Sequence, residues 1–151
     1  MSRSADYTIQ GFLYQFNKTL VEILKASDDA VIHIEGIVED IEIKTSAGLD
    51  AIQCKYHETQ EKFALSTLYK PLLQMMHHFH LNNDSTIKYK LFCHFPMDAE
   101  RSELTITKSD LETTLETKNQ TLQKYTAARN GCINVDDSLR QSSFEIGASL
   151  D

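Results

Sequence analysis

Two short stretches decide the fold of this chain: IEGIVEDIEI at residues 34–43 and IQCKY at residues 52–56. Both alternate apolar and polar residues, and side chains along a β-strand point alternately to the two faces of a sheet. On the second stretch Gln53 and Lys55 therefore share one face, and Cys54 points to the other. Asp40 lies on the polar side of the first stretch. If the two strands pair, Asp40, Gln53 and Lys55 converge on one patch.

The surrounding pattern predicts an α/β domain in which helices pack on a central mixed sheet. A helix is expected at about residues 8–26, followed by strands at about 30–37, 38–44 and 50–57, with a hairpin loop at 45–49. A second helical region, kinked or restarted at Pro71, is expected at about 63–81, and a further strand at about 87–95.

The C-terminal part has a mostly helical pattern. The spacing predicts a polar helix over about 108–129 that ends near Gly131, and then a short helix from Asp136 followed by the stretch 144–147. We expect a single domain over residues 1–151, with a core at about 8–95 and a helical extension at about 100–151. The chain stops without a breaker or a polar fade, which predicts that it is the N-terminal part of a longer protein.

The first predicted helix has two different sides. Gln15, Lys18 and Glu22 form a polar row, in which Gln15 and Glu22 are two turns apart and lie on almost the same face. The other side is a continuous apolar stripe at helical spacing. The stripe consists of Ile9, Phe12, Leu13, Phe16, Leu20, Ile23 and Leu24. The polar row could add a third element to the strand patch.

Composition limits the classes of function. The chain of 151 residues is 41% apolar with a net charge of −7, so it is expected to fold but not to bind DNA phosphates through a general excess of Lys and Arg. Metal ions or another domain would have to supply that positive charge. No apolar run approaches the ~20 residues that cross a bilayer. Three widely spaced cysteines indicate a reducing compartment, and we predict a cytoplasmic protein with no membrane partner.

The predicted patch carries the groups that phosphodiester hydrolysis needs. A hard cation, Mg²⁺ or Mn²⁺, holds the phosphate and polarises a water, and it takes oxygen ligands of which only one or two are carboxylates. Asp40 is the expected carboxylate ligand and Gln53 an amide ligand, while Lys55 would position the water or stabilise negative charge. The backbone carbonyl of Cys54 is a further candidate ligand. Additional residues that could close the site are Gln15, Glu22 and Glu35.

The spacing of these residues resembles the PD-(D/E)xK nuclease superfamily. Glu39-Asp40, thirteen residues from Asp40 to Gln53, and then Gln53-Cys54-Lys55 resemble its Mrr-like restriction branch. Together with residues 11–15 and 34–36, the pattern is similar to the dsDNA endonuclease domain of bacterial antiphage effectors, which include the Cap4-type effectors of CBASS systems and nuclease subunits of Lamassu and Avs. The resemblance covers about residues 8–95.

The resemblance implies a restriction-endonuclease-like core and a Mg²⁺-dependent enzyme that cuts double-stranded DNA as the effector of antiphage defence. Homo-oligomerisation or defence-complex subunits would control it. In this comparison Asp40 is the metal-binding acid, Gln53 replaces the second acid and Lys55 is the catalytic lysine. The chain departs from the motif at Glu39, which stands for the proline, and at Gln53, which lowers the negative charge at the metal and leaves one ion or two open.

Several alternatives stay open. Asp40 and Lys55 would also suit an ordinary cross-strand ion pair, worth about 0.2–1 kcal/mol. The domain could instead be a catalytically inactive nuclease-like module that binds protein or DNA, and the amide at Gln53 and the net charge of −7 favour that alternative. On the last predicted strand, Lys88 and Lys90 are candidates for DNA contacts or for solvated lysines.

Two other chemistries are disfavoured by spacing. A zinc site is not indicated, because the histidines and cysteine that could form it lack the spacing of a closed Cys/His site. The residues in question are His77, His78, His80, Cys93 and His94. Cys54 is predicted to face the core and to point away from His57, which argues against a nucleophilic thiol.

Overall fold

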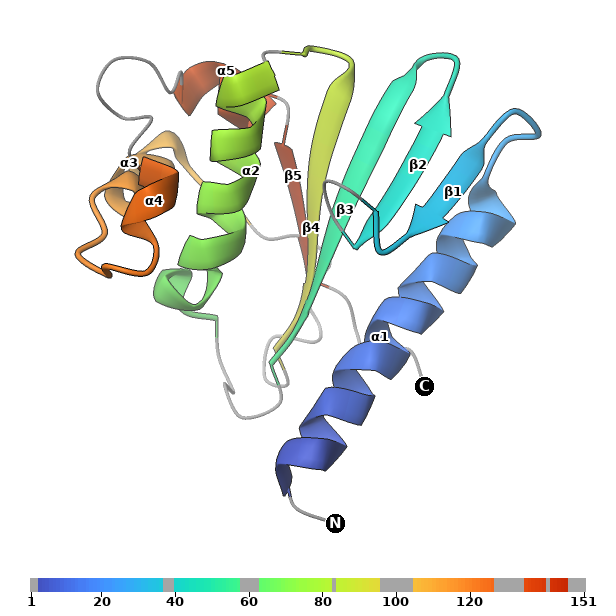
Figure 1. The fold of residues 1–151 in the computed structure, drawn as a ribbon, viewed down its shortest axis with the longest axis horizontal. Helices are drawn as coiled ribbons and strands as arrows, with labels where there is room; N and C mark the ends of the chain where they lie inside the picture. The colour runs from blue at the N-terminus through green and yellow to red at the C-terminus, as the bar shows by residue number, and fades with distance from the viewer. Residues whose placement is uncertain are drawn as a thin grey trace.

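A computed structural model describes residues 3–36, 40–57, 63–82, 84–95, 105–126, 135–140 and 142–146. It confirms the α/β class: within these residues a five-stranded mixed sheet lies between helices (Figure 1). The strands follow one another in chain order across the sheet. They are β1 (Val31–Ile34), β2 (Ile41–Thr45), β3 (Gly48–Tyr56), β4 (Ile87–His94) and β5 (Ser142–Ile146). The first three form an antiparallel meander, and β4 and β5 then join in parallel.

The meander turns at the predicted hairpin loop. β2 ends at Thr45 and β3 begins at Gly48, whose φ is 148°. A Cβ at Gly48 would lie 2.3 Å from the carbonyl oxygen of Thr86, so the absence of a side chain lets the hairpin approach the start of β4. The backbone N–H of Leu49 donates to the same carbonyl at 3.0 Å. This contact aligns β3 with β4.

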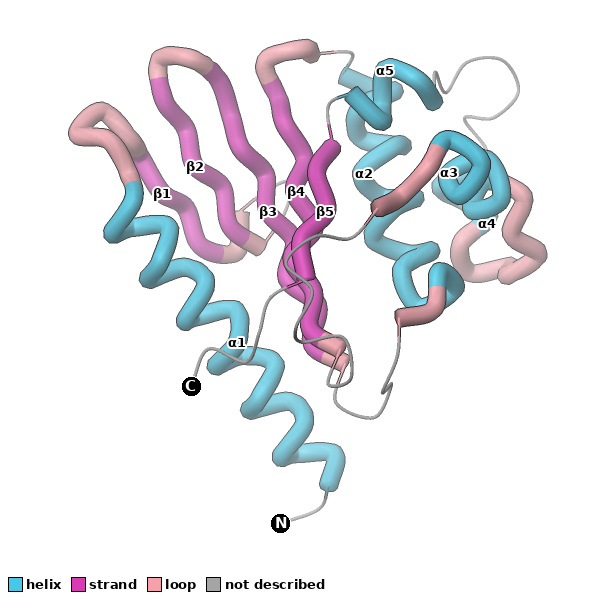
Figure 2. Tube along the Cα trace, turned by 180° about the vertical axis from the view of Figure 1, so that it is seen from behind, coloured by secondary structure: helices cyan, strands magenta, loops and turns pink. Residues whose placement is uncertain are grey.

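One face of the sheet, which we call the α2 face, carries the main core. α2 (Tyr69–Asn82) follows a short 3₁₀ turn at Leu65–Leu68, and Pro71 lies in the first turn of α2, which confirms the predicted restart. Three shorter helices pack beside α2 on the side away from α1 (Figure 2). They are α3 (Lys108–Leu115), α4 (Gln123–Thr126) and α5 (Val135–Arg140). The core between α2 and the sheet includes Leu72, Leu73, Met76, Tyr89, Leu91 and Phe95.

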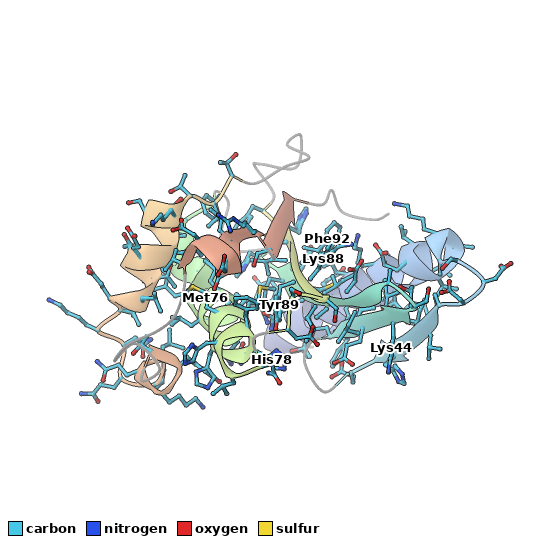
Figure 3. All side chains as sticks on the ribbon, turned by 90° about the horizontal axis from the view of Figure 1, so that it is seen from above. Lys44, Met76, His78, Lys88, Tyr89 and Phe92 are labelled. Atoms are coloured by element: carbon cyan, nitrogen blue, oxygen red, sulfur yellow. The ribbon has the colours of Figure 1, made fainter. Side chains whose placement is uncertain are left out.

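The opposite side of the sheet, the α1 face, is covered by a single helix within the part of the chain that the structure describes. α1 (Arg3–Lys25) lies across the sheet from α2, as Figure 3 shows from above. A second, smaller core lies beneath it and consists of Tyr14, Ile41, Ile52 and Phe92. Among the described residues, no helix combines the length and apolar character needed to span a bilayer.

The predicted helix over 108–129 is wrong as a single element. α3 ends at Leu115 and α4 occupies only Gln123–Thr126. In between, the side chain of Asn119 accepts hydrogen bonds from the backbone N–H and the hydroxyl of Thr121, at 3.0 and 2.8 Å. Such local bonds offer the backbone an alternative to the helix and explain the break. The predicted cap at Gly131 lies outside the described residues.

The C-terminal extension is not only helical, because β5 adds a strand to the sheet. β5 pairs in parallel with β4, with Leu91 beside Phe144. Parallel strands need a long crossover connection, and the segment that holds α3, α4 and α5 provides it. The sheet therefore extends beyond residue 95, the limit predicted for the core. Residues 37–39, which include the end of the strand predicted over 30–37 and the start of the one predicted over 38–44, lie outside the described part of the chain.

Candidate active site

Asp40 lies directly before β2 and is tied to β3. Its Oδ2 accepts a hydrogen bond from the backbone N–H of Cys54 at 2.8 Å. In the β2–β3 register Ile41 lies opposite Ile52, which places Asp40 across from Gln53. The carboxylate therefore joins the ends of two neighbouring strands. This bond uses a backbone donor, and no side-chain pattern in the sequence could have revealed it.

Gln53 and Lys55 share the α2 face, as the alternation predicts. In the parallel β3–β4 ladder Gln53 lies beside Leu91, and Lys55 lies beside Cys93. Leu91 and Cys93 belong to the core on the α2 face. Lys55 is half-buried, whereas Gln53 is only 8% exposed. The structure thus brings Asp40, Gln53 and Lys55 to one patch on adjacent strand ends.

Burial and the neighbouring charges together set the pKa of the Asp40 carboxyl. Burial raises the pKa of the Asp40 carboxyl, while the hydrogen bond from Cys54 and the positive charge of Lys55 lower it and the charge of Glu35 raises it further. The net effect on the pKa is upward from the ordinary value of 3.8. A positive ion beside Asp40 would favour the carboxylate over the protonated acid.

Glu35 and, through it, Gln15 are linked to the turn that precedes β2. The backbone N–H of Glu35 donates to the carbonyl oxygen of Asp40 at 2.8 Å, which closes the turn between β1 and β2. The side-chain Nε2 of Gln15 donates to Glu35 Oε1 at 3.0 Å, so α1 is linked to the same turn. Glu35 has a φ of 53°, a conformation that non-glycine residues rarely adopt and that tends to occur at functional sites.

Glu22, from the same predicted row, takes part in a different interaction. It forms an ion pair with Lys18 at 2.7 Å, and Lys18 Nζ lies 4.4 Å from the centre of the Phe92 ring. Lys18 is 8% exposed, so this pair is held between α1 and the sheet. The i,i+4 spacing of Lys18 and Glu22 is a sequence signal for such a pair. The structure links Gln15, rather than Glu22, to the Asp40 turn.

The two lysines of β4 lie on the other side of the sheet. The β3–β4 register puts Lys88 beside Asp50 and Lys90 beside Ile52, which is on the α1 face. Figure 3 shows Lys88 and Phe92 on one side of β4 and Tyr89 on the side of α2. Lys90 forms an ion pair with Asp50 at 2.7 Å, and Lys88 is exposed. Any DNA contact from them would be made across the sheet from Gln53 and Lys55.

A groove of about 690 Å³ lies beside Glu35, and Asp40, Gln53 and Lys55 are not among its described lining residues. It runs between the β1–β2 hairpin and the C-terminal end of α2, and Glu35 and Gly36 line it. A Cβ at Gly36 would lie 2.3 Å from Cδ of the buried Glu42, so a larger residue at this position would require the flexible Glu42 side chain to move. Lys44, another lining residue, places an exposed positive charge in the groove.

The thiol and imidazole groups near the site have other partners. Burial raises the pKa of the Cys54 thiol to about 12, so this thiol is protonated at neutral pH and is no nucleophile. His57 stacks on Phe95 at 4.8 Å, and burial together with the charge of Lys55 lowers the pKa of its imidazole. His78 Nδ1 lies 2.6 Å from the hydroxyl of Tyr89.

The donor set at the patch fits a hard cation. Oε1 of Gln53 is buried and has no hydrogen-bond partner among the described residues, a state that costs about 1–3 kcal/mol unless an ion or a water satisfies it. It lies on the strand next to the Asp40 carboxylate, and both are oxygen donors. Within the described part of the chain, no group of three or more His, Cys, Asp or Glu could hold a metal. An ion here would keep several water ligands, as Mg²⁺ does.

One family model matches most of the chain. The model for the Cap4 dsDNA endonuclease domain matches residues 3–142. The chain belongs to this family. It is a DNA endonuclease domain whose substrate is double-stranded DNA, and the resemblance drawn from the sequence is confirmed. The match extends beyond residues 8–95 and takes in α3, α4 and α5. No curated protein and no solved structure gives a significant match to the chain.

Proposed function

We propose that Asp40, Gln53 and Lys55 form the catalytic site of a Mg²⁺-dependent endonuclease that cuts double-stranded DNA as the effector of a bacterial antiphage defence system. The observation that supports this proposal most strongly is the juxtaposition of three groups on two strand ends. They are a carboxylate held by the Cys54 N–H, a buried amide oxygen without a partner and a lysine two residues further along β3.

Each residue has a role that follows from its position. Asp40 and Gln53 would hold Mg²⁺ or Mn²⁺, which when bound supplies positive charge for the phosphate and acidifies a water. Gln53 is 8% exposed, so it can act on a small ion or a water but not on the DNA backbone itself. Lys55 is half-buried and would donate to the phosphate or to the attacking water, which stabilises the negative charge that develops there.

Glu35 and Gln15 are positioning residues in this proposal. Glu35 closes the turn that carries Asp40, and Gln15 fixes the Glu35 carboxylate from α1. The net charge of −7 makes DNA binding depend on the cation or on basic surface supplied by another domain. Oligomerisation or partner subunits of the defence complex would control when such a nuclease is active.

Cleavage of supercoiled plasmid, with and without Mg²⁺, tests the catalytic site. We expect Lys55→Ala to reduce the rate by about 10²–10³-fold, the size of effect seen when a group that stabilises developing charge is removed. Lys118→Ala is the matched control, because Lys118 is an exposed lysine after α3, far along the chain from the patch. Lys118→Ala should cut at the wild-type rate. Chelation of Mg²⁺ should stop cleavage by the wild type and by Lys118→Ala.

Two results would contradict the proposal. Wild-type cleavage in both Lys55→Ala and Asp40→Ala, with folding unchanged by circular dichroism, would place the catalytic site elsewhere. DNA binding by the wild type without any cleavage in Mg²⁺ or Mn²⁺ would identify the domain as the inactive module, in which Gln53 no longer serves catalysis.

A further inference from the structure

The apolar side of α1 points away from the sheet. Among the described residues, eleven large hydrophobic side chains are exposed; ten belong to α1 and β1, and the eleventh is Leu81 of α2. Those on α1 between residues 9 and 24 form what we call the α1 stripe and are 47–77% exposed. The α1 stripe consists of Ile9, Phe12, Leu13, Phe16, Leu20, Ile23 and Leu24. Monomeric proteins rarely expose a continuous apolar patch of this extent.

α1 cannot rotate to bury the α1 stripe against the sheet without losing its present contacts. Tyr14 and Lys18 face the sheet, at 4% and 8% exposed, and Phe16 lies two residues from each of them, about 200° around the helix. Tyr14 stacks on Phe92 at 5.0 Å, and Lys18 is paired with Glu22. Turning the stripe inward would break these contacts, so the stripe has to be covered from outside.

The N-terminal half of the α1 stripe borders a groove, and its C-terminal end carries a highly exposed leucine. A groove of about 350 Å³ is lined by Ile9, Phe12, Leu13, Phe16 and, from β1, Ile34, and the Gln15–Glu35 hydrogen bond borders it. At the C-terminal end of α1, Leu24 is 77% exposed, the highest value among the exposed large hydrophobic residues.

We propose that the α1 stripe binds the α1 stripe of a second copy of this chain, with the two helices antiparallel. The stripe is nearly symmetric about Phe16, because Ile9 and Ile23 lie seven residues to either side and Phe12 and Leu20 lie four residues to either side. In an antiparallel pair Phe16 meets its own counterpart. Leu20 and Leu24 of each copy then reach the groove at the N-terminal half of the other. This is the self-complementary contact that two-fold symmetry requires.

Charge favours a second copy in the antiparallel direction. Two chains with a net charge of −7 repel one another, so they can associate best through a surface with little charge. The residues that border the stripe between positions 8 and 17 are uncharged, among them Thr8, Gln10 and Asn17. Asp6 lies at one end of α1 and Lys25 at the other, and both are exposed. The antiparallel arrangement brings Asp6 of each copy towards Lys25 of the other and opposes the helix dipoles, whereas a parallel one brings like charges together.

The proposed contact also adjoins the candidate active site. Gln15 and Glu35 border the groove, and Glu35 closes the turn that holds Asp40. Filling the groove with leucines of a second copy would exclude water from the Gln15–Glu35 hydrogen bond and fix this turn. Pairing of the α1 stripes therefore provides a route by which association stabilises the catalytic arrangement.

Sedimentation equilibrium of the 151-residue chain tests the proposal. We expect a dimer for the wild type, and a dissociation constant at least about thirty-fold higher for Phe16→Glu, because the two introduced carboxylates would face each other at the centre of the contact. Leu24→Glu provides a second variant. Leu81→Glu is the matched control, since Leu81 is 66% exposed but lies on α2, and it should dimerise like the wild type.

Mixing two variants tests the symmetry. Phe16→Glu and Phe16→Lys should each be monomeric alone and should form a heterodimer when mixed, because opposite charges then meet at position 16. A wild-type chain that stays monomeric at 100 μM, on the order of the weakest affinity useful for a specific dimer, would overturn the proposal. So would a dimer unaffected by both Phe16→Glu and Leu24→Glu. Failure of the mixed pair to associate would overturn the antiparallel arrangement.

Discussion

α1 and α2 pack on opposite faces of one sheet, and they differ in which side of the helix faces the sheet. α2 turns its apolar side inward and buries Leu72, Leu73 and Met76. α1 turns a polar side inward, where Lys18 lies, and leaves Phe16 exposed. Both helices have apolar residues at the same helical spacing. The difference therefore comes from the side chains that each face of the sheet presents to its helix.

The sheet offers a different surface to each helix. On the α2 face, β4 presents Tyr89, Leu91 and Cys93, a continuous apolar row. On the α1 face the same strand presents Lys88 and Lys90 before Phe92, so its apolar surface is short. Lys18 can be buried there because Glu22 neutralises its charge and the Phe92 ring supports it through a cation–π contact. Helical spacing identifies an amphipathic helix, but the facing strands decide which side is buried.

The largest expected effect separates the two helices by stability. Leu73→Ala in α2 should lower the free energy of unfolding by about 2–5 kcal/mol, because Leu73 is 0% exposed and a cavity would remain. Leu24→Ala in α1 should change it by less than about 0.5 kcal/mol, as is usual for an exposed residue. Urea unfolding at a concentration where the chain sediments as a monomer measures both. Equal losses in the two variants would show that the stripe is covered within one chain.

Asp40 is expected to contribute to cleavage and not to stability. Asp40→Asn should reduce plasmid cleavage by at least about 10²-fold, because the charge of a bound metal is worth several kcal/mol. Its free energy of unfolding should be unchanged or higher by about 1 kcal/mol at most, after allowance for solvent screening. The amide oxygen can still accept from the Cys54 N–H, and the burden of a buried charge is removed. Parallel thermal melts and cleavage assays check this, and loss of both stability and activity would make Asp40 a structural residue.

The smallest expected effect is a shift in the pH profile of cleavage. The pKa of the Asp40 carboxyl is raised, so cleavage that needs the carboxylate should increase as the pH rises through this pKa. The contribution of Asp40 to stability is greatest at low pH and declines over the same pH range. Glu35→Gln removes a negative charge that raises the pKa of Asp40, and should shift the cleavage profile to lower pH. The exposed Glu112→Gln in α3 is the control. An unshifted profile in Glu35→Gln would mean that Asp40 does not control the rate.

The sequence predicted more of the patch formed by Asp40, Gln53 and Lys55 than of the helices around it. The period of two along β3 put Gln53 and Lys55 on one face, and the hairpin loop at 45–49 set the pairing that brings Asp40 opposite Gln53. These are local features, fixed by strand alternation and turn chemistry. The break between α3 and α4 was missed because the hydrogen bonds of Asn119 compete with a helix that the spacing alone favours.

Strand alternation, the hairpin and the order of residues that resembles the endonuclease family follow from the sequence, because they depend on neighbours within a few positions. Contacts between distant segments were needed to show that Gln15, and not Glu22, reaches the Asp40 turn, that β5 adds to the sheet, and that Lys88 and Lys90 lie across the sheet from Lys55. The orientation of α1 belongs to the same group. An amphipathic helix has two sides, and the facing side chains of the sheet determine which of them is buried.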